Sequence, residues 1–188
     1  MKYPAESYTT EDCLAILEAC GKSWTGRRNR ALIVLMWRAG LRLAEALAVK
    51  TWDVDAKNKT IRVRHGKGDK ARTVGFDAKA AGELGAWLGV RGTPTEEKEF
   101  LVCTRRGDPL QQSYVRAMLP RLARKAGVNK RVHAHGFRHT FAVELTREGV
   151  SVIYIQRLLG HSSLATTSVY LASLSPEEAL DSVRFREW

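Results

Sequence analysis

A histidine and a tyrosine near the C-terminus have side chains suited to chemistry on a phosphodiester. His161 lies in the sequence Leu-Gly-His-Ser-Ser, and Tyr170 follows nine residues later in Thr-Thr-Ser-Val-Tyr-Leu. An imidazole can donate a hydrogen bond to a phosphate oxygen, and a phenol that loses its proton can attack phosphorus. Tyr170 can equally complete the apolar face of a helix with Val169 and Leu171. The pair therefore indicates phosphoryl transfer only if further phosphate-binding groups accompany it.

Two segments upstream can supply such groups. Residues 135–139 read His-Gly-Phe-Arg-His, and on a helix the side chains of His135, Arg138 and His139 share one face. Residues 40–45 read Gly-Leu-Arg-Leu-Ala-Glu. Arg42 there lies between two leucines, where a guanidinium needs a partner, and Glu45 can provide an orienting carboxylate. These spacings predict a cationic site for a phosphate.

The histidines allow a second interpretation as metal ligands. His133 would be the third ligand beside His135 and His139. The segment lacks the glutamate of a His-Glu-x-x-His motif, and no carboxylate lies nearby in sequence. We predict neither a metal ion nor another cofactor.

A lysine between two glycines adds a further candidate. Lys67 lies in Gly-Lys-Gly-Asp-Lys, between two segments in which apolar and polar residues alternate as in a β-hairpin. By default this is a solvated turn lysine. The two glycines, however, allow the turn to approach a duplex backbone closely, so that the ammonium group can reach into a groove. Lys70 is an alternative in the same turn.

Basic residues outnumber acidic ones and gather in two stretches. The 188 residues include 31 lysines and arginines and 20 acids, for a net charge of +11 at pH 7. This excess favours a polyanion, double-stranded DNA above all, as the partner. No acid occurs between Asp108 and Glu144, whereas a merely solvated face mixes both signs. We predict DNA contacts from Arg62, Arg64, Lys70, Arg72, Arg116, Arg121, Arg124, Lys125, Lys130 and Arg131.

The cysteines and the hydropathy pattern bear on the compartment. Cys13, Cys20 and Cys103 lack metal-ligand spacing and are typical of small buried residues in a reducing compartment. No apolar run approaches the roughly 20 residues of a membrane span, and the N-terminus lacks a signal-peptide pattern. We expect a cytoplasmic protein associated with DNA and not with a membrane.

The periodicity predicts one mainly α-helical domain with a small antiparallel β-sheet, an α+β fold. A hairpin is expected over 60–65 and 72–76, a short strand or extended segment over 100–103 and a turn over 106–109. A buried central helix is expected over 27–39, where the sequence is apolar on nearly all sides. The other helices are predicted from Thr9 or Thr10 to Gly21 and over 41–49, 77–90, 111–126, 136–148, 152–159 and 162–172, with one more after 175–178.

The ordered set of motifs is more specific than any one of them. Gly-Leu-Arg-x-x-Glu, Gly-Lys-Gly-x-Lys, His-x-x-Arg-His, Leu-Gly-His-Ser-Ser and a tyrosine nine residues after that last histidine follow one another along the chain. This order resembles the tyrosine recombinase (phage integrase) family from about residue 8 to 175. The resemblance implies the catalytic-domain fold of that family over residues 8–174. Residues 175–188 would then form a C-terminal helix or tail, either exchanged between protomers or docked on its own chain.

The resemblance also implies a role for each candidate residue. Arg42, Lys67, His135, Arg138 and His161 would surround the scissile phosphate, and Tyr170 would be the nucleophile that forms a 3′-phosphotyrosyl link. Glu45 and His139 would support them. The implied activity is site-specific DNA recombination, with self-association as a dimer to tetramer on DNA.

Three other functions remain open from the sequence. A type IB topoisomerase shares the phosphotyrosine chemistry, a catalytically silent DNA-binding protein can keep the fold and the basic face, and a metal-dependent nuclease would use the three histidines. Most family members also carry an N-terminal domain that clamps DNA, whereas the catalytic-type domain begins here almost at Met1. The sequence fits both an excised catalytic domain and the short single-domain members. Without the clamp we expect weak, salt-sensitive DNA binding.

Overall fold

Helices dominate the structure, a computed structural model that describes residues 7–64, 71–92 and 99–160. A three-stranded antiparallel sheet in the order β1-β2-β3 accompanies them. This confirms the predicted α+β class. The helices are α1 (Thr10–Cys20), α2 (Trp24–Trp37), α3 (Leu43–Ala48), α4 (Ala78–Arg91), α5 (Gln112–Lys125), α6 (Ala134–Arg147) and α7 (Val152–Leu159); the strands are β1 (Val54–Asp55), β2 (Thr60–Val63) and β3 (Arg72–Gly75), and a 3-10 turn, η1, spans Thr51–Asp53.

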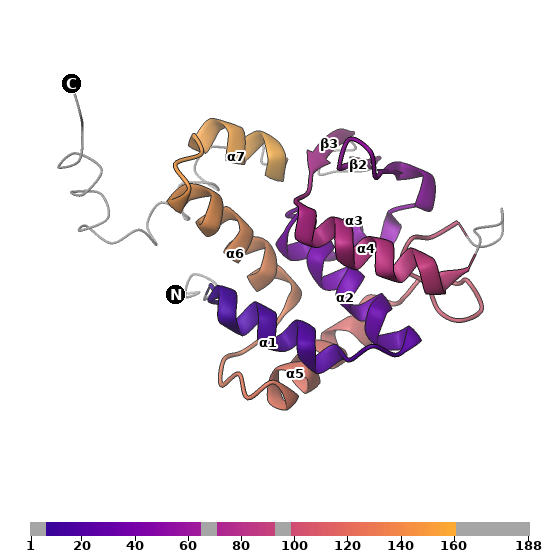
Figure 1. Ribbon diagram of the computed structural model, residues 1–188. Coiled ribbons are helices and arrows are strands. Elements are labelled where there is room, and N and C mark those ends of the chain that lie inside the picture. Colours follow the sequence, from indigo (N-terminus) through magenta and orange to yellow (C-terminus); the bar gives the residue numbers. More distant parts are fainter. Residues whose placement is uncertain (1–6, 65–70, 93–98, 161–188) are drawn as a thin grey trace, which may run out of the picture.

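Helix α2 forms the centre of the molecule (Figure 1). It contacts α1, α3, α4 and α6, and the residues from Ala31 to Trp37 are almost completely buried. The helix begins three residues before its predicted start at residue 27. The Ser23 hydroxyl caps it by accepting from the Gly26 amide at 3.1 Å. Gly26 lies so close to the Cys20 carbonyl that a Cβ would approach that oxygen to 2.5 Å, so the tight connection between α1 and α2 requires glycine at this position.

Helix α1 begins as its sequence predicts. Thr9 is the cap: its hydroxyl accepts from the Asp12 amide, and the Asp12 carboxylate accepts from the Thr9 amide. Cys13 is fully buried and Cys20 partly buried. Burial raises the pKa of both thiols, that of Cys20 to about 12, so both are neutral. The prediction of buried cysteines is confirmed for Cys13 and Cys103, while Cys20 is buried only in part.

The sheet places two arginines on opposite sides. Ile61 pairs with Val74, Arg62 with Thr73 and Val63 with Arg72. Directly opposed residues point to the same face of a sheet. Arg72 therefore shares the inner face with buried Val63, whereas Arg62 is exposed on the outer face. The two-residue strand β1 was not predicted, because a segment so short carries no alternation signal.

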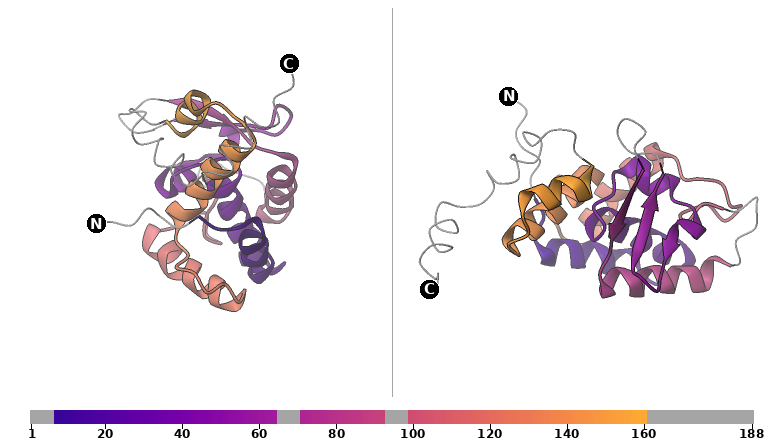
Figure 2. Two further views of the ribbon diagram at one scale, coloured as in Figure 1. Left: turned by 90° about the vertical axis from the view of Figure 1, so that its left-hand side faces the viewer. Right: turned by 90° about the horizontal axis from the view of Figure 1, so that it is seen from above.

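Helices α6 and α7 form a corner beside the sheet (Figures 1 and 2). Helix α7 has its predicted bounds, and Gly160 ends it in the left-handed conformation with φ of 62°. Helix α6 begins at Ala134, two residues before the predicted start. A small cluster of three buried residues, Ala142, Ile155 and Leu159, joins the two helices and is separate from the main core.

Residues 99–103, the first described residues after α4, form isolated bridges and not the short strand that was one of the two predictions. Phe100 forms an isolated bridge with Lys50, and Cys103 forms another with Pro109. The Trp87 indole donates to the Leu101 carbonyl at 2.7 Å and holds this segment against α4. Within the described ranges, no helix combines the length and apolar character needed to cross a bilayer. The helices predicted after residue 161 lie outside the described residues.

Candidate active site

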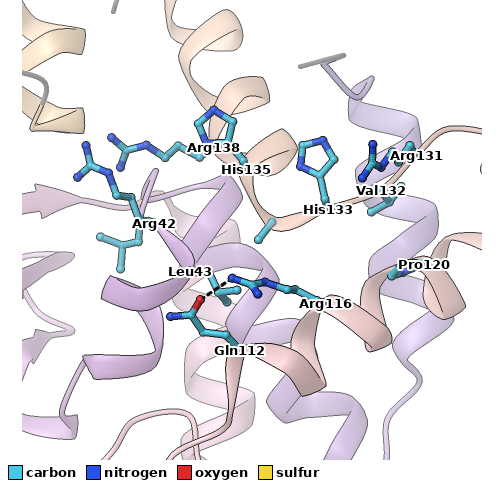
Figure 3. Close-up of a pocket in the computed structure, with 12 residues that line it drawn as sticks. Arg42, Leu43, Gln112, Arg116, Pro120, Arg131, Val132, His133, His135 and Arg138 are labelled. Atoms are coloured by element: carbon cyan, nitrogen blue, oxygen red, sulfur yellow. Dashed lines mark hydrogen bonds between the residues drawn. The ribbon is translucent and has the colours of Figure 1, made fainter. Parts of the chain in front are cut away.

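A cavity of about 510 Å³ joins the start of α3 to α5 and the start of α6 (Figure 3). Three of the predicted phosphate-binding residues, Arg42, His135 and Arg138, contribute to its wall. Two predicted DNA contacts, Arg116 and Arg131, also line it. The remaining lining residues are Leu41, Leu43, Gln112, Pro120, Val132, His133 and Ala134.

Arg138 is held inside the protein at the edge of this cavity. Its residue exposure is 1%, and its guanidinium donates to the Gly40 carbonyl at 2.6 Å and to the Leu159 carbonyl at 2.5 Å. Gly40 has φ of 64°, and a Cβ there would meet the Phe141 ring at 2.5 Å. The turn after α2 therefore requires glycine, and it presents its carbonyl to Arg138.

Arg42 and Glu45 pair as their spacing predicts. The Glu45 carboxylate accepts from the Arg42 amide at 2.8 Å and from its Nη1 at 2.7 Å. Arg42 Nη2 also donates to the Gly160 carbonyl at 3.3 Å. Glu45 thus caps α3 and fixes the direction of the Arg42 side chain, which lies beside that of Arg138 (Figure 3).

The same carboxylate binds Arg72. Its two oxygens accept from Nη1 and Nη2 of Arg72 at 2.9 and 2.8 Å, and Arg138 Nη1 lies 3.7 Å from one of them. Burial of Glu45 opposes ionisation, but the hydrogen bonds from Arg72 and Arg42 outweigh it and lower its pKa to about 2. Arg72 was predicted to contact DNA, whereas the structure directs its side chain into the protein because the hairpin register turns it to the inner face.

His135 is placed to exchange a proton at the cavity. It is exposed there, and its ring lies on the same wall as Arg138 (Figure 3). Partial burial and the nearby charges of Arg138, His133 and Arg42 lower its pKa below the usual 6.5. The shift favours the neutral imidazole, which is the form that can accept a proton.

His133 caps α6, which the sequence did not predict. Its Nδ1 accepts from the Gly136 amide at 3.1 Å. The Tyr8 hydroxyl accepts from the His133 amide at 2.9 Å, and its ring packs so closely that a Cβ on Gly136 would meet that hydroxyl at 2.0 Å. The sequence pattern placed the start of α6 at Gly136. It could not show the contact between Tyr8 and Gly136, because these residues are far apart in sequence.

His139 lies on α6 together with His135 and Arg138, as predicted. It is buried, and the residues found to line the cavity include His135 and Arg138 without it. Burial lowers its pKa to about 4, with smaller contributions from His135 and His133. In the described ranges, no three His, Cys, Asp or Glu side chains are grouped closely enough to hold a metal ion. This geometry gives no support there to the three-histidine nuclease.

Most of the other predicted DNA contacts are exposed: Arg62, Arg64, Arg121, Arg124 and Lys125. Three of these also bond within the protein, Arg64 to Asp53 at 2.7 Å, Arg121 to the Ala117 carbonyl at 3.1 Å and Lys125 to the Ala19 carbonyl at 2.8 Å. Lys130 is partly buried and bonds to Asp12 at 2.9 Å. Gln112, which the sequence analysis passed over, lines the cavity beside Arg116 and accepts from it at 3.0 Å. Lys67, Lys70, His161 and Tyr170 lie outside the described residues.

Comparison with known proteins identifies the family. A sequence-family model described as "Phage integrase family" matches residues 6–176. The chain belongs to this family. It is 42% identical over 149 residues to tyrosine recombinase XerA of Thermococcus kodakarensis, covering 78% of this chain and 51% of that protein. It is 38% identical over 150 residues to XerC of Bacillus licheniformis, covering 77% and 49%. The chain thus spans about half the length of these curated relatives.

Solved structures extend the similarity to the whole fold. A crystal structure of XerA recombinase has a TM-score of 0.85 at 28% identity and covers all of this chain and 68% of that one. A post-cleavage complex of XerH with palindromic difH substrate has a TM-score of 0.78 at 29% identity, covering 96% and 53%. The catalytic domain of bacteriophage HP1 integrase, at 20% identity and a TM-score of 0.67, matches in fold over 97% of this chain and 96% of that one. The predicted tyrosine recombinase catalytic-domain fold is confirmed.

Proposed function

We propose that this chain cleaves and rejoins DNA strands through a 3′-phosphotyrosyl intermediate, as the catalytic part of a site-specific recombinase. The observation that carries the proposal is the convergence of Arg42, Arg138 and His135 on one cavity, with Glu45 orienting the first arginine. These groups come from two segments nearly 100 residues apart in sequence. They provide fixed positive charge and a neutral base at the same place.

The proposed reaction uses these groups in one displacement. The scissile phosphate occupies the cavity, and the Tyr170 oxygen forms a bond to phosphorus as the bond to the 5′-oxygen breaks. Arg42 and Arg138 neutralise the charge gained on the non-bridging oxygens, an effect worth about 10²- to 10³-fold in rate for each such donor. His135 takes the tyrosine proton.

The remaining roles fall to residues outside the described ranges. His161 donates to a non-bridging oxygen, and Lys67 protonates the leaving 5′-oxygen, with Lys70 as the alternative. Attack of a 5′-hydroxyl on the phosphotyrosine then rejoins a strand and releases the tyrosine. The covalent link conserves the energy of the phosphodiester, so the reaction is balanced without a metal or a nucleotide.

Double-stranded DNA is the proposed partner, in the cytoplasm. The net charge of +11 and the exposed cations of α5 support it, as does the difH substrate in the XerH structure. We further propose that the chain self-associates on DNA as a dimer to tetramer. Residues 175–188 either pass to a neighbouring protomer or dock on their own chain. If they pass to a neighbour, truncation of the chain after Leu174 should reduce assembly on DNA.

A nicked suicide substrate tests the proposed activity, because loss of the short strand beyond the cut traps the covalent link. We expect a denaturation-resistant adduct that maps to Tyr170 and persists with a chelator present. Tyr170→Phe should abolish the adduct while DNA affinity is retained. A wild-type chain that binds DNA without forming an adduct would instead be a silent DNA-binding protein. Relaxation of supercoils without sequence preference would indicate a topoisomerase. DNA cleavage that a chelator abolishes would indicate a metal-dependent nuclease.

A further inference from the structure

Arg72 connects three parts of the candidate site. It begins β3, two residues after Lys70 in the turn that carries the predicted lysine. Its guanidinium forms a two-pronged bond with Glu45, and its Nε donates to the Leu158 carbonyl at the end of α7 at 2.9 Å. The side chain is 12% exposed. One residue thus joins the hairpin, the carboxylate that orients Arg42 and the helix that precedes His161.

The end of α7 is held by arginines at three successive carbonyls. Arg72 donates to Leu158 and Arg138 to Leu159, while Arg42 donates to Gly160. Gly160 takes the left-handed conformation, and a Cβ there would lie 3.2 to 3.3 Å from atoms of the Arg72 side chain. The C-terminal carbonyls of a helix carry partial negative charge, which makes them suitable acceptors for guanidinium groups. The geometry of α7 is therefore tied to that of the arginine pair.

Resting on the proposed function, we propose that Arg72 is a positioning residue of the strand-transfer site and not a DNA contact. It holds Glu45, and through Glu45 the Arg42 side chain, in register with the end of α7 and strand β3. Arginine is required because its planar fork binds both carboxylate oxygens while Nε reaches a third acceptor. A lysine carries the same charge but cannot make this set of bonds.

Arg30 provides a matched control within the same chain. Its Nε and Nη2 bind the two oxygens of Glu83 at 2.7 and 2.5 Å, its Nη1 donates to the Leu17 carbonyl at 2.8 Å, and its side chain is 15% exposed. Like Arg72 it combines a two-pronged bond to a carboxylate with one bond to a carbonyl, and it adds longer bonds of 3.4 Å to the exposed Glu18. It joins α2 to α4 and α1, and it does not line the cavity. Loss of either arginine removes a similar set of bonds. A difference in cleavage rate between the two variants therefore reflects the place of Arg72 beside the candidate site and not the number of bonds lost.

The first arm of the test compares cleavage with DNA binding. We expect Arg72→Lys and Arg72→Gln to cut the rate of adduct formation at saturating DNA by about 10²-fold, the size of effect that misplaced reacting groups produce. DNA affinity and its salt dependence should stay as in the wild type. Arg30→Gln should keep the wild-type rate at a temperature where all variants are folded by circular dichroism. Arg62→Gln, at an exposed predicted contact, should lower the slope of log affinity against log salt by about 0.9.

Two results in this arm would overturn the proposal. One is a lower salt slope in Arg72→Gln that Arg72→Lys restores, because that pattern belongs to a phosphate contact. The other is a cleavage rate in both Arg72 variants equal to that of Arg30→Gln.

The second arm needs no cleavage activity and therefore separates this proposal from the proposed function. In the DNA-free chain, Arg72→Gln should speed amide exchange over residues 157–160 about tenfold, as loss of one hydrogen bond implies. It should also raise the pKa of Glu45 above its value of about 2. If the wild-type chain forms no adduct, the proposed function is wrong. The amide exchange and the pKa of Glu45 then decide alone whether Arg72 positions Glu45 and the end of α7. Unchanged exchange and an unchanged Glu45 pKa would overturn its positioning role.

Discussion

The helical body around α2 and the corner formed by α6 and α7 are stabilised in different ways. The body has one large apolar core that includes Trp37 and Trp87, both almost completely buried. The corner has a cluster of three buried residues, and the end of α7 is held by bonds from Arg72, Arg138 and Arg42. Helix α6 packs against α2, whereas the end of α7 depends for its position on residues of the candidate site itself.

This difference has a functional meaning. Apolar burial is non-directional and tolerates small shifts. Guanidinium-to-carbonyl bonds are directional, and they fix the donor–acceptor distance to within a few tenths of an ångström. Helix α7 leads directly to His161. A phosphate bound between Arg42 and Arg138 would share these two side chains with the end of α7, so we expect substrate binding to be coupled to the position of that helix end.

The largest loss of stability should come from the body. Trp37→Ala removes a buried indole that also donates to Glu144 at 3.0 Å, and it should lower the free energy of unfolding by about 3–5 kcal/mol. Urea denaturation measures this loss. The control Trp52→Ala, at a residue that is 55% exposed, should change stability by less than about 0.5 kcal/mol. Equal losses in the two variants would contradict the assignment of the core.

Glu45→Gln should have the next largest effect, about 3 kcal/mol at neutral pH, because it leaves buried arginines without their carboxylate. The pKa of Glu45 falls from 4.5 to about 2 on folding, so its contribution is complete above pH 4.5 and is lost as the pH falls toward 2. Denaturation from pH 7 to pH 2 should therefore show the wild-type advantage over Glu45→Gln shrinking in that window. A constant difference would refute the ionised state of Glu45.

A smaller and more local effect is expected from Ile155→Ala in the corner. We expect about 2 kcal/mol, the lower end for such truncations, because the cluster is small. Amide exchange should accelerate mainly in α7, while the amides of α2 remain protected. Ile153→Ala on the same helix, at a residue that is 52% exposed, should leave both unchanged. Equal acceleration in α2 and α7 after Ile155→Ala would show that the corner and the body unfold as one unit.

The smallest effect on stability is expected at the predicted DNA surface. Arg124→Gln, on the exposed face of α5, should change stability by less than about 0.5 kcal/mol. It should lower the salt slope of DNA binding by about 0.9. The exposed Lys79 on α4, outside the predicted DNA contacts, supplies the control variant Lys79→Gln. An equal change of the salt slope in both variants would show that DNA binding is not confined to the predicted surface.

The sequence predicted those features that depend on local pattern. The all-round apolar run of α2, the amphipathic α7 and the alternating hairpin each carry their own period, and all three form close to the predicted bounds. The pairing of Arg42 with Glu45 was also predictable, since residues three apart on a helix are neighbours.

Features set by long-range contacts escaped prediction. Arg72 is in phase with the buried Val74, so the alternation of β3 directs it inward, but its partner Glu45 lies in a separate segment that the pattern does not connect to it. The start of α6 depends on Tyr8, more than 120 residues away. His139 shares a sequence motif with His135 and Arg138, yet the packing of α6 against the body buries it. In each case the missing information is a tertiary contact.

The most direct test of the phosphate site compares two substrates with Arg42→Ala. On an ordinary suicide substrate, this variant should form the adduct about 10²- to 10³-fold more slowly than the wild type. On a substrate with a neutral methylphosphonate at the scissile position, one non-bridging charge is absent and the arginine has less to neutralise. We predict that the deficit of the variant shrinks by at least about tenfold on this substrate. The same deficit on both substrates would contradict a role for Arg42 in neutralising the phosphate.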